Sequence, residues 1–332
     1  LLDEVKLSGA EVHYDTVIQD VIQNGQVTGV TGIQKGKPVS YQAPITIDTG
    51  GSMSLLQDKA DFSGTTFDTN VSYTQFCSAY REVIKLSKPV DWHDAIIFKP
   101  TAELGYLWYF PRTPTLINVG VGFQMNKPPM ELVKAVQDDI RSHPDFKDCT
   151  VIDKLGAALP TRRPFDSAVA PGFLAAGDSA GHVNPTTGGG IGAAANSGHF
   201  AAQTAMSAID SNDVSESSLW DYNAKVMESF GKRYAAMDLY NIWGGAHDVS
   251  ELTDIISCIP AQQLVDIMSK HGNTTMGLWV KFKTLTKSFR HWGLLFELYR
   301  INKEAGRLKH HYDRYPSSPD GFDLWKRERD LI

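Results

Sequence analysis

The residues best suited to chemistry lie between Gly172 and Gly192, where an acidic side chain follows a short apolar run and a glycine-rich turn leads into a helix. Residues 174–176 have the composition of a buried parallel strand, and Asp178 follows that strand closely. Open α/β sheets bind ligands at such strand ends. Residues 188–190 are all glycine, so main-chain N–H groups can approach a ligand at the positive end of the next helix. The pattern predicts a large, partly anionic, polyhydroxylated ligand, and a flavin dinucleotide fits; the alternative is a glycine-rich loop without a ligand.

A second motif places three aromatic rings at alternate positions of one predicted strand: Tyr106, Trp108 and Phe110. The period of two puts these rings on one face, whereas Tyr109 points to the other. Gly120 and Gly122 remove bulk from one face of the neighbouring strand. The motif predicts a long apolar slot, and the alternative is an ordinary aromatic sheet core.

The surrounding elements predict an α/β fold with an inserted sheet. A discontinuous Rossmann-like FAD-binding domain is expected over residues 1–55 and 151–240. Residues 56–150 carry an antiparallel sheet that would bind substrate, and residues 241–332 form a C-terminal helical region. Asn24 and Gly25 predict a hairpin turn. Helices are expected over residues 129–143, 193–209 and 219–240.

A further strand ends at Asp48, with Gly50 two residues beyond it. Asp48 is either a cofactor ligand or a turn residue that caps Gly50. The chain starts at Leu1 and contains no Gly-x-Gly-x-x-Gly turn, which normally opens a dinucleotide-binding fold of this type. We therefore expect the sequence to be the C-terminal part of a longer protein.

Composition places the 332 residues among ordinary globular proteins, and the net charge of −6 argues against nucleic acid as a main partner. The three cysteines are far apart, which excludes a cysteine metal site. The sequence shows neither a spanning apolar stretch nor a secretory signal, so a cytoplasmic protein is expected. Residues 281–315 carry nine Lys or Arg against three Asp or Glu, with interleaved aromatics. This basic segment favours peripheral contact with an anionic inner membrane face, or else a docked helix with a solvated face.

The glycine-rich motif resembles the second flavin fingerprint of the FAD-dependent hydroxylase and reductase superfamily. The resemblance implies that Asp178 binds the ribityl chain and that residues 185–190 lie along the flavin ring. N–H groups at the helix start would then stabilise negative charge on reduced flavin. The cofactor-binding residues expected are Asp48, Gly50, Gly177, Asp178, Pro185, Gly188, Gly189, Gly190 and Ile191.

The aromatic motif is similar to the Tyr-x-Trp-x-Phe-Pro and Gly-x-Gly signature of the geranylgeranyl reductases, including the archaeal enzymes that act on digeranylgeranyl glycerophospholipids. The signature is met by Tyr106, Trp108, Phe110, Pro111, Gly120 and Gly122. It implies FAD-dependent hydrogenation of carbon–carbon double bonds in geranylgeranyl chains of membrane lipids, with a hydride from reduced flavin and a proton from a donor. The implied partners are a geranylgeranyl lipid or prenyl diphosphate and an electron donor, NADPH or a ferredoxin-like protein.

The candidate proton donors are Tyr106, Tyr109 and His182, each with a purely structural alternative. Cys77 joins the expected substrate-binding residues, and a buried small side chain is its alternative. Arg162 and Arg163 are placed to contact a phosphate headgroup, the cofactor or solvent. Two other functions stay open at this point: an FAD-dependent aromatic monooxygenase or halogenase of the same superfamily, and a non-catalytic lipid-binding protein.

Overall fold

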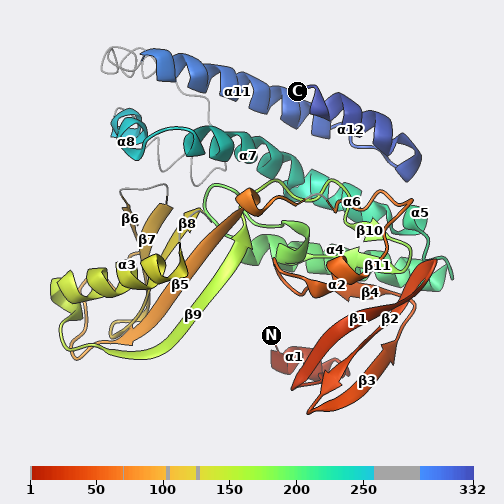
Figure 1. Ribbon diagram of the computed structural model, residues 1–332, viewed down its shortest axis with the longest axis horizontal. Helices are drawn as coiled ribbons and strands as arrows, with labels where there is room; N and C mark the ends of the chain where they lie inside the picture. Colours follow the sequence, from red (N-terminus) through yellow and green to blue (C-terminus); the bar gives the residue numbers. More distant parts are fainter. Residues whose placement is uncertain (1, 70, 102–104, 125–127, 258–291) are drawn as a thin grey trace.

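The computed structural model describes residues 2–69, 71–101, 105–124, 128–257 and 292–332. These residues form three sheets, with orders β1-β2-β3, β10-β11-β4 and β6-β7-β8-β5-β9. Helices lie against the second and third sheets, and the C-terminal helices run along one side of the molecule (Figure 1). The structure confirms the mixed α/β fold with an inserted antiparallel sheet.

The small central sheet carries the strand ends that the sequence singled out. It consists of β4 (Thr46–Asp48), β10 (Val169–Ala170) and β11 (Phe173–Ala175). Strands β4 and β11 are parallel, and Ala175 is the register partner of Asp48. Both strands therefore end at the same edge, beside helix α4 (Ile191–Asp210). The buried face of α4 consists of small residues, which lets the helix lie close to the strands: Ala193, Ser197, Ala201, Thr204, Ala205 and Ala208.

A hairpin sheet precedes this core. Its strands are β1 (Thr16–Asn24), β2 (Gln26–Gln34) and β3 (Lys37–Gln42). Gly25 forms the turn with a φ of +72°, which confirms the predicted hairpin. The short helices of this part are α1 (Leu2–Leu7) and α2 (Leu55–Lys59).

The five-stranded sheet is antiparallel throughout. Its strands are β5 (Phe76–Lys85), β6 (Ile97–Pro100), β7 (Gly105–Thr113), β8 (Leu116–Gln124) and β9 (Thr150–Pro160). Helix α3 (Pro129–Ser142) covers one face with Leu132, Val136 and Ile140, as its periodicity predicts (Figure 1). Strand β9 pairs with β5 along its whole length, so the sheet continues to Pro160, beyond the expected domain boundary near residue 151. Upstream, Phe62 and Phe67 pack in the central core, so the sheet begins only at Phe76.

The expected helix over residues 219–240 is interrupted. Helix α6 (Asp221–Val226) passes through a π-helical turn at Met227–Gly231 into α7 (Lys232–Gly245). The remaining helices are α5 (Glu216–Leu219), α8 (Val249–Ser257), α11 (Trp292–Tyr312) and α12 (Phe322–Asp330). Helix α11 runs beside α7 (Figure 1). Within the described residues, none of the helices is both long and apolar enough to cross a membrane. Residues 281–291 of the basic segment lie outside the described residues.

Candidate functional site

Asp48 ends β4 as a buried cap. Its Oδ1 accepts the N–H of Gly50 at 2.9 Å, and its Oδ2 accepts the Ser54 hydroxyl at 2.6 Å and the Gln57 amide at 2.9 Å. Gln57 also donates to the carbonyl oxygen of Ser179, at 2.7 Å, and so joins the ends of β4 and β11. Because the Asp48 carboxylate is committed to these three donors, the structure favours the turn-capping alternative over a direct cofactor contact.

Asp178 is in the opposite situation. It follows β11, is half-buried, and its carboxylate makes no hydrogen bond or ion pair with the residues that the structure describes. Burial raises the pKa of this carboxyl above its ordinary value. A Cβ at position 190 would lie 3.2 Å from Asp178 Oδ1, so glycine there leaves the carboxylate room beside the start of α4. An unpartnered, partly desolvated carboxylate is suited to accept hydrogen bonds from a polyol.

The glycine turn is shaped by Asn184, which the sequence analysis overlooked. Its Oδ1 accepts N–H groups of Thr186 and Thr187 and the Thr186 hydroxyl, and its carbonyl oxygen accepts the N–H of Gly188 at 2.9 Å. Gly188 has a φ of +68°, which favours glycine. The Asn-Pro pair at 184–185 is a turn signal that identifies this role from sequence.

Helix α4 opens without a side-chain cap. Gly190 occupies the N-cap position and offers no side-chain acceptor, so the first N–H groups of a 20-residue helix are left for another acceptor. Ile191, at the first position, is 92% exposed. With Asp178 nearby, this helix start combines free donors, positive dipole charge and one carboxylate, which suits the flavin predicted from the motif.

His182 lies close to this site and is fully buried. Its Nδ1 accepts the N–H of Gly177 at 3.2 Å, and its ring packs edge-on against Phe230, with centroids 5.2 Å apart. Burial lowers the pKa of His182 to about 3, so the imidazole stays neutral. His182 therefore supports the turn at Gly177, which has a φ of +70°, and is not placed to exchange a proton with a substrate.

The aromatic face of β7 meets the glycine turn. The Tyr106 hydroxyl donates to the carbonyl oxygen of Thr187, and a Cβ at Gly188 would lie 3.1 Å from Leu159 of β9. Burial, with a contribution from Cys77, raises the pKa of Tyr106. The two motifs, 81 residues apart at this contact, thus form one site.

Trp108 fills the space that the glycines were expected to open. A Cβ on Gly120 would lie 2.1 Å from the indole ring, so Trp108 rests flat on β8 at this point. The absence of a side chain at Gly120 therefore makes room for the Trp108 ring, and this position does not open the predicted apolar slot. Phe110 stacks on Trp108 with ring centroids 5.8 Å apart. Gly122 faces Cys77, whose Sγ would lie 3.5 Å from an added Cβ.

Cys77 and Tyr109 have structural surroundings. Burial raises the pKa of Cys77 to about 12, so the residue is a neutral thiol in the sheet face. Tyr109 lies on the opposite face, as the period of two predicts, and donates to Asp139 of α3 at 2.5 Å. Its pKa is raised by burial and by this carboxylate. The candidate role of Tyr109 as a proton donor does not fit this placement, because the sheet separates it from the glycine turn.

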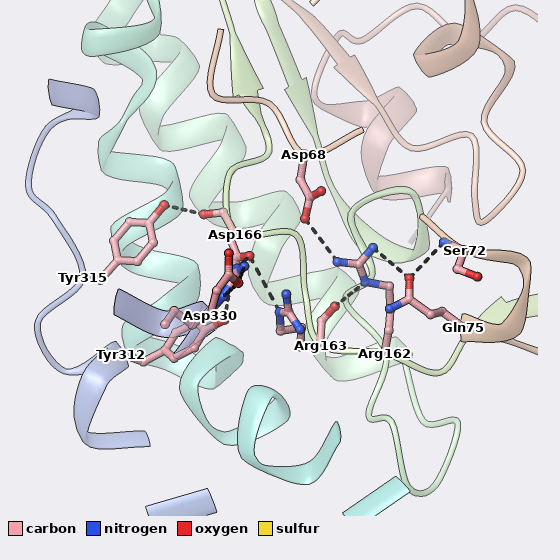
Figure 2. Close-up of polar contacts among 10 residues, drawn as sticks. Asp68, Ser72, Gln75, Arg162, Arg163, Asp166, Tyr312, Tyr315 and Asp330 are labelled. Atoms are coloured by element: carbon pink, nitrogen blue, oxygen red, sulfur yellow. Dashed lines mark hydrogen bonds and ion pairs between the residues drawn. The ribbon is translucent and has the colours of Figure 1, made fainter. Parts of the chain in front are cut away.

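Arg162 is buried inside the protein, whereas Arg163 is partly exposed. Arg162 is 2% exposed and donates to Asp68 at 3.1 Å, and Arg163 forms an ion pair with the buried Asp166 (Figure 2). The expectation that these arginines contact a lipid headgroup is not supported for Arg162, since its guanidinium is enclosed by protein acceptors.

Comparison with known proteins agrees with this geometry. Residues 75–159, which correspond to the five-stranded sheet and helix α3, match the family model of the geranylgeranyl reductase catalytic domain. The digeranylgeranylglycerophospholipid reductase of Sulfolobus acidocaldarius is 32% identical over 262 residues, covering 76% of this chain and 57% of that protein. The enzyme of the same name from Thermoplasma acidophilum is 27% identical, covering 85% of this chain and 69% of that protein. The chain thus spans little more than half of the Sulfolobus relative.

Solved structures share the fold. A geranylgeranyl bacteriochlorophyll reductase-like protein from Thermoplasma acidophilum superposes with a TM-score of 0.70 at 23% identity, covering 91% of this chain and 72% of that one. A myxobacterial chondrochloren halogenase, a variant of FAD-dependent halogenases, gives a TM-score of 0.57 at 14% identity, covering 87% of this chain and 71% of that one. The sequence matches and the shared fold confirm the resemblance to the geranylgeranyl reductase family predicted from residues 106–122 and 178–191.

Proposed function

We propose that the protein is an FAD-dependent oxidoreductase that hydrogenates carbon–carbon double bonds in geranylgeranyl chains of isoprenoid lipids. The observation that carries the proposal is the contact of Tyr106 with Thr187, which joins the aromatic face of β7 to the glycine turn. The match of residues 75–159 to a geranylgeranyl reductase catalytic domain supports the substrate class. When bound, reduced FAD would supply a hydride to one alkene carbon while the other takes a proton.

The residues have distinct parts in this proposal. Asp178 accepts hydrogen bonds from hydroxyl groups of the cofactor, and the N–H groups at the start of α4 face the negative charge of the cofactor. Trp108 and Phe110 give the prenyl chain an apolar wall and exclude water from a cationic transition state. Tyr106 fixes the wall against the turn, and its hydroxyl, which contacts Thr187 of the turn, supplies the proton. The electrons come from NADPH or a ferredoxin-like donor.

The test uses the natural protein that carries this chain, loaded with FAD and reduced under anaerobic conditions. Geranylgeranyl phospholipids in mixed micelles are added, and lipids are analysed by mass spectrometry while flavin absorbance is followed. We expect flavin oxidation together with a gain of one H₂ per double bond reduced. Flavin that stays reduced beside unchanged lipid contradicts the proposal. Oxygen consumption with an aromatic substrate, and no lipid reduction, would indicate the monooxygenase or halogenase alternative.

We also propose that the protein rests on the cytoplasmic membrane surface through α11. Phe296 and Tyr299 are 63% and 65% exposed on this helix, with the exposed cations Arg300 and Lys303 beside them. Aromatic rings next to cations on one helix face suit an anionic bilayer. Sedimentation with phosphatidylglycerol vesicles should deplete the protein, and the double variant Phe296→Ser, Tyr299→Ser should stay in solution. Leu324→Ser, on the exposed part of α12, is the matched control, and equal binding of both variants contradicts the proposal.

A further inference from the structure

The five-stranded sheet joins the rest of the chain at two segments. We call residues 72–75, which lead into β5, the incoming crossing, and residues 161–163, which leave β9, the outgoing crossing. The N–H of Thr161 donates to the carbonyl oxygen of Gln75 at 2.8 Å, so the two crossings lie together. Figure 1 shows β5 and β9 running side by side toward this point. The placement of the sheet relative to the glycine turn depends on this pair of segments, on the Tyr106 contact and on the Ser52 hydroxyl, which donates to the carbonyl oxygen of Ala158 in β9 at 2.6 Å.

One guanidinium connects both crossings to the central core. Arg162 donates from Nη1 to Gln75 Oε1 at 3.4 Å, from Nη2 to Asp68 Oδ2 at 3.1 Å, and from Nε to the carbonyl oxygen of Arg163 at 2.9 Å (Figure 2). Gln75 Oε1 also accepts the N–H of Ser72 at 3.0 Å, which closes the incoming crossing. The side chains of Arg162 and Asp68 are 2% and 6% exposed. Water therefore cannot substitute for these contacts without a local opening.

The outgoing crossing is held from its other side by the C-terminal helices. The Asn241 amide of α7 donates to the carbonyl oxygen of Thr161 at 2.9 Å. Asp166 follows this crossing. Its carboxylate accepts the hydroxyl of Tyr312 of α11 and forms an ion pair with Arg329 of α12, and its main-chain carbonyl oxygen accepts the hydroxyl of Tyr315. The crossing is thus bonded to α7 directly, and to α11 and α12 through the ion pair of Arg163 with Asp166 (Figure 2).

The buried charge of Arg162 serves to fix geometry more than to add stability. Removing an arginine from water is costly, and a buried ion pair adds little net stability compared with apolar packing. A planar guanidinium, however, directs several donors at fixed angles, which lysine cannot do. Arg162 directs one nitrogen to the incoming crossing, one to Asp68 of the core and one to the main chain of its own crossing, so its strongest effect is on the relative placement of these parts.

We propose that Arg162 is a positioning residue that holds the aromatic face of β7 at the correct angle to the glycine turn. It touches neither face itself and acts through the paired crossings. The inference rests on the proposed function, because the angle between the aromatic face of β7 and the glycine turn matters only when one reaction uses both. Misplacement of reacting groups by about 1 Å costs on the order of a hundredfold in rate.

The decisive variant is Gln75→Leu, which removes the link to the incoming crossing and leaves the buried Arg162–Asp68 pair intact. Arg162→Lys is the second variant, since it retains the charge and loses the fork. Arg141→Met is the matched control, an exposed arginine of α3 that pairs with Asp138. Each is compared with wild type by flavin titration, by the rate of lipid reduction at saturating lipid, by reoxidation of reduced flavin in air, and by amide hydrogen exchange.

For Gln75→Leu and Arg162→Lys we expect unchanged flavin affinity, lipid reduction slower by on the order of tenfold or more, and faster reoxidation by oxygen. Exchange should accelerate in peptides that cover residues 72–76, 105–113 and 161–163. Unchanged reduction despite faster exchange overturns the proposal, and so does a loss of flavin affinity that matches the loss of rate. If wild type reduces no lipid, the proposed function fails separately. Amide hydrogen exchange of residues 105–113 in the two variants then tests the positioning role of Arg162. Faster exchange than in wild type supports that role, and exchange equal to wild type contradicts it.

Discussion

The hydroxyl of Tyr106 donates a hydrogen bond to the main-chain carbonyl oxygen of Thr187, and this bond ties the aromatic strand to the glycine turn. Since the acceptor is a main-chain atom of the turn, movement of the strand moves the turn with it. Arg162 acts on the same relationship from the crossings at this end of the sheet, where β5 begins and β9 ends.

Tyr106→Phe should slow lipid reduction several-fold and lower the free energy of unfolding by about 1 kcal/mol, because one hydrogen bond is lost and the ring is retained. Turnover assays and urea unfolding measure the two effects. Tyr14→Phe, at a position that is 51% exposed, is the control and should change neither. Wild-type turnover in Tyr106→Phe would exclude a role for the hydroxyl.

Tyr109→Phe should lower the stability of the protein without slowing turnover. It leaves buried Asp139 with Lys99, at 2.5 Å, as its remaining side-chain partner, so the free energy of unfolding should fall by about 1–3 kcal/mol. Turnover of the folded fraction should equal that of wild type, because the hydroxyl faces α3. A selective loss of turnover, with unfolding unchanged, would return Tyr109 to the list of proton donors.

Gly120→Ala should displace Trp108, since the new methyl group would lie 2.1 Å from the indole. Overpacking of this kind costs about 1–3 kcal/mol of folding free energy. We expect lipid reduction to be lost while flavin titrates as in wild type. The control is Gly306→Ala in α11, where an added Cβ meets no atom within 4 Å, and which should be neutral or slightly stabilising. Normal lipid reduction by Gly120→Ala would show that the packing of Trp108 against Gly120 is dispensable.

Asp178→Asn tests the carboxylate at the end of β11. Burial raises its pKa in the folded protein, so the folded state holds this proton more tightly than the unfolded state does. This carboxyl therefore favours folding at low pH, and that contribution is lost as the pH rises through the raised pKa. In the flavin-free protein, Asp178→Asn should not show this loss of stability with rising pH. Urea unfolding at a series of acidic pH values measures the difference. In flavin titrations Asp178→Asn should bind more weakly than wild type; equal affinity would remove Asp178 from the cofactor site.

His182→Gln tests the buried imidazole. Its pKa is lowered from 6.5 to about 3 in the folded protein, so below pH 6.5 only the unfolded state gains the proton. Its contribution to stability is complete above pH 6.5 and is lost progressively as the pH falls. Wild type should lose about 2 kcal/mol more than His182→Gln between pH 7 and pH 5. Parallel pH profiles in urea unfolding would show that His182 is accessible to protons.

Local sequence patterns determined much of this protein. The period of two in β7 fixed which rings share a face, because strand geometry allows no other assignment. The Asn24–Gly25 pair fixed a hairpin, and the glycine triplet marked the start of α4. Asp178 could be placed at a strand end for the same reason. Each inference depends on residues close together in the chain, where backbone sterics and side-chain spacing act directly.

Only the tertiary structure decided which polar side chains are free. Asp48 and Asp178 look alike in sequence, yet Gln57 and Ser54 engage the first while no described side chain engages the second. By sequence, Arg162 was expected to contact a phosphate headgroup, the cofactor or solvent, yet it is buried and donates to Gln75, which lies 87 residues earlier in the chain. Burial and hydrogen-bond partners arise from contacts between distant segments. The spacing of residues along the chain does not encode these contacts, and they set the chemistry of each charge.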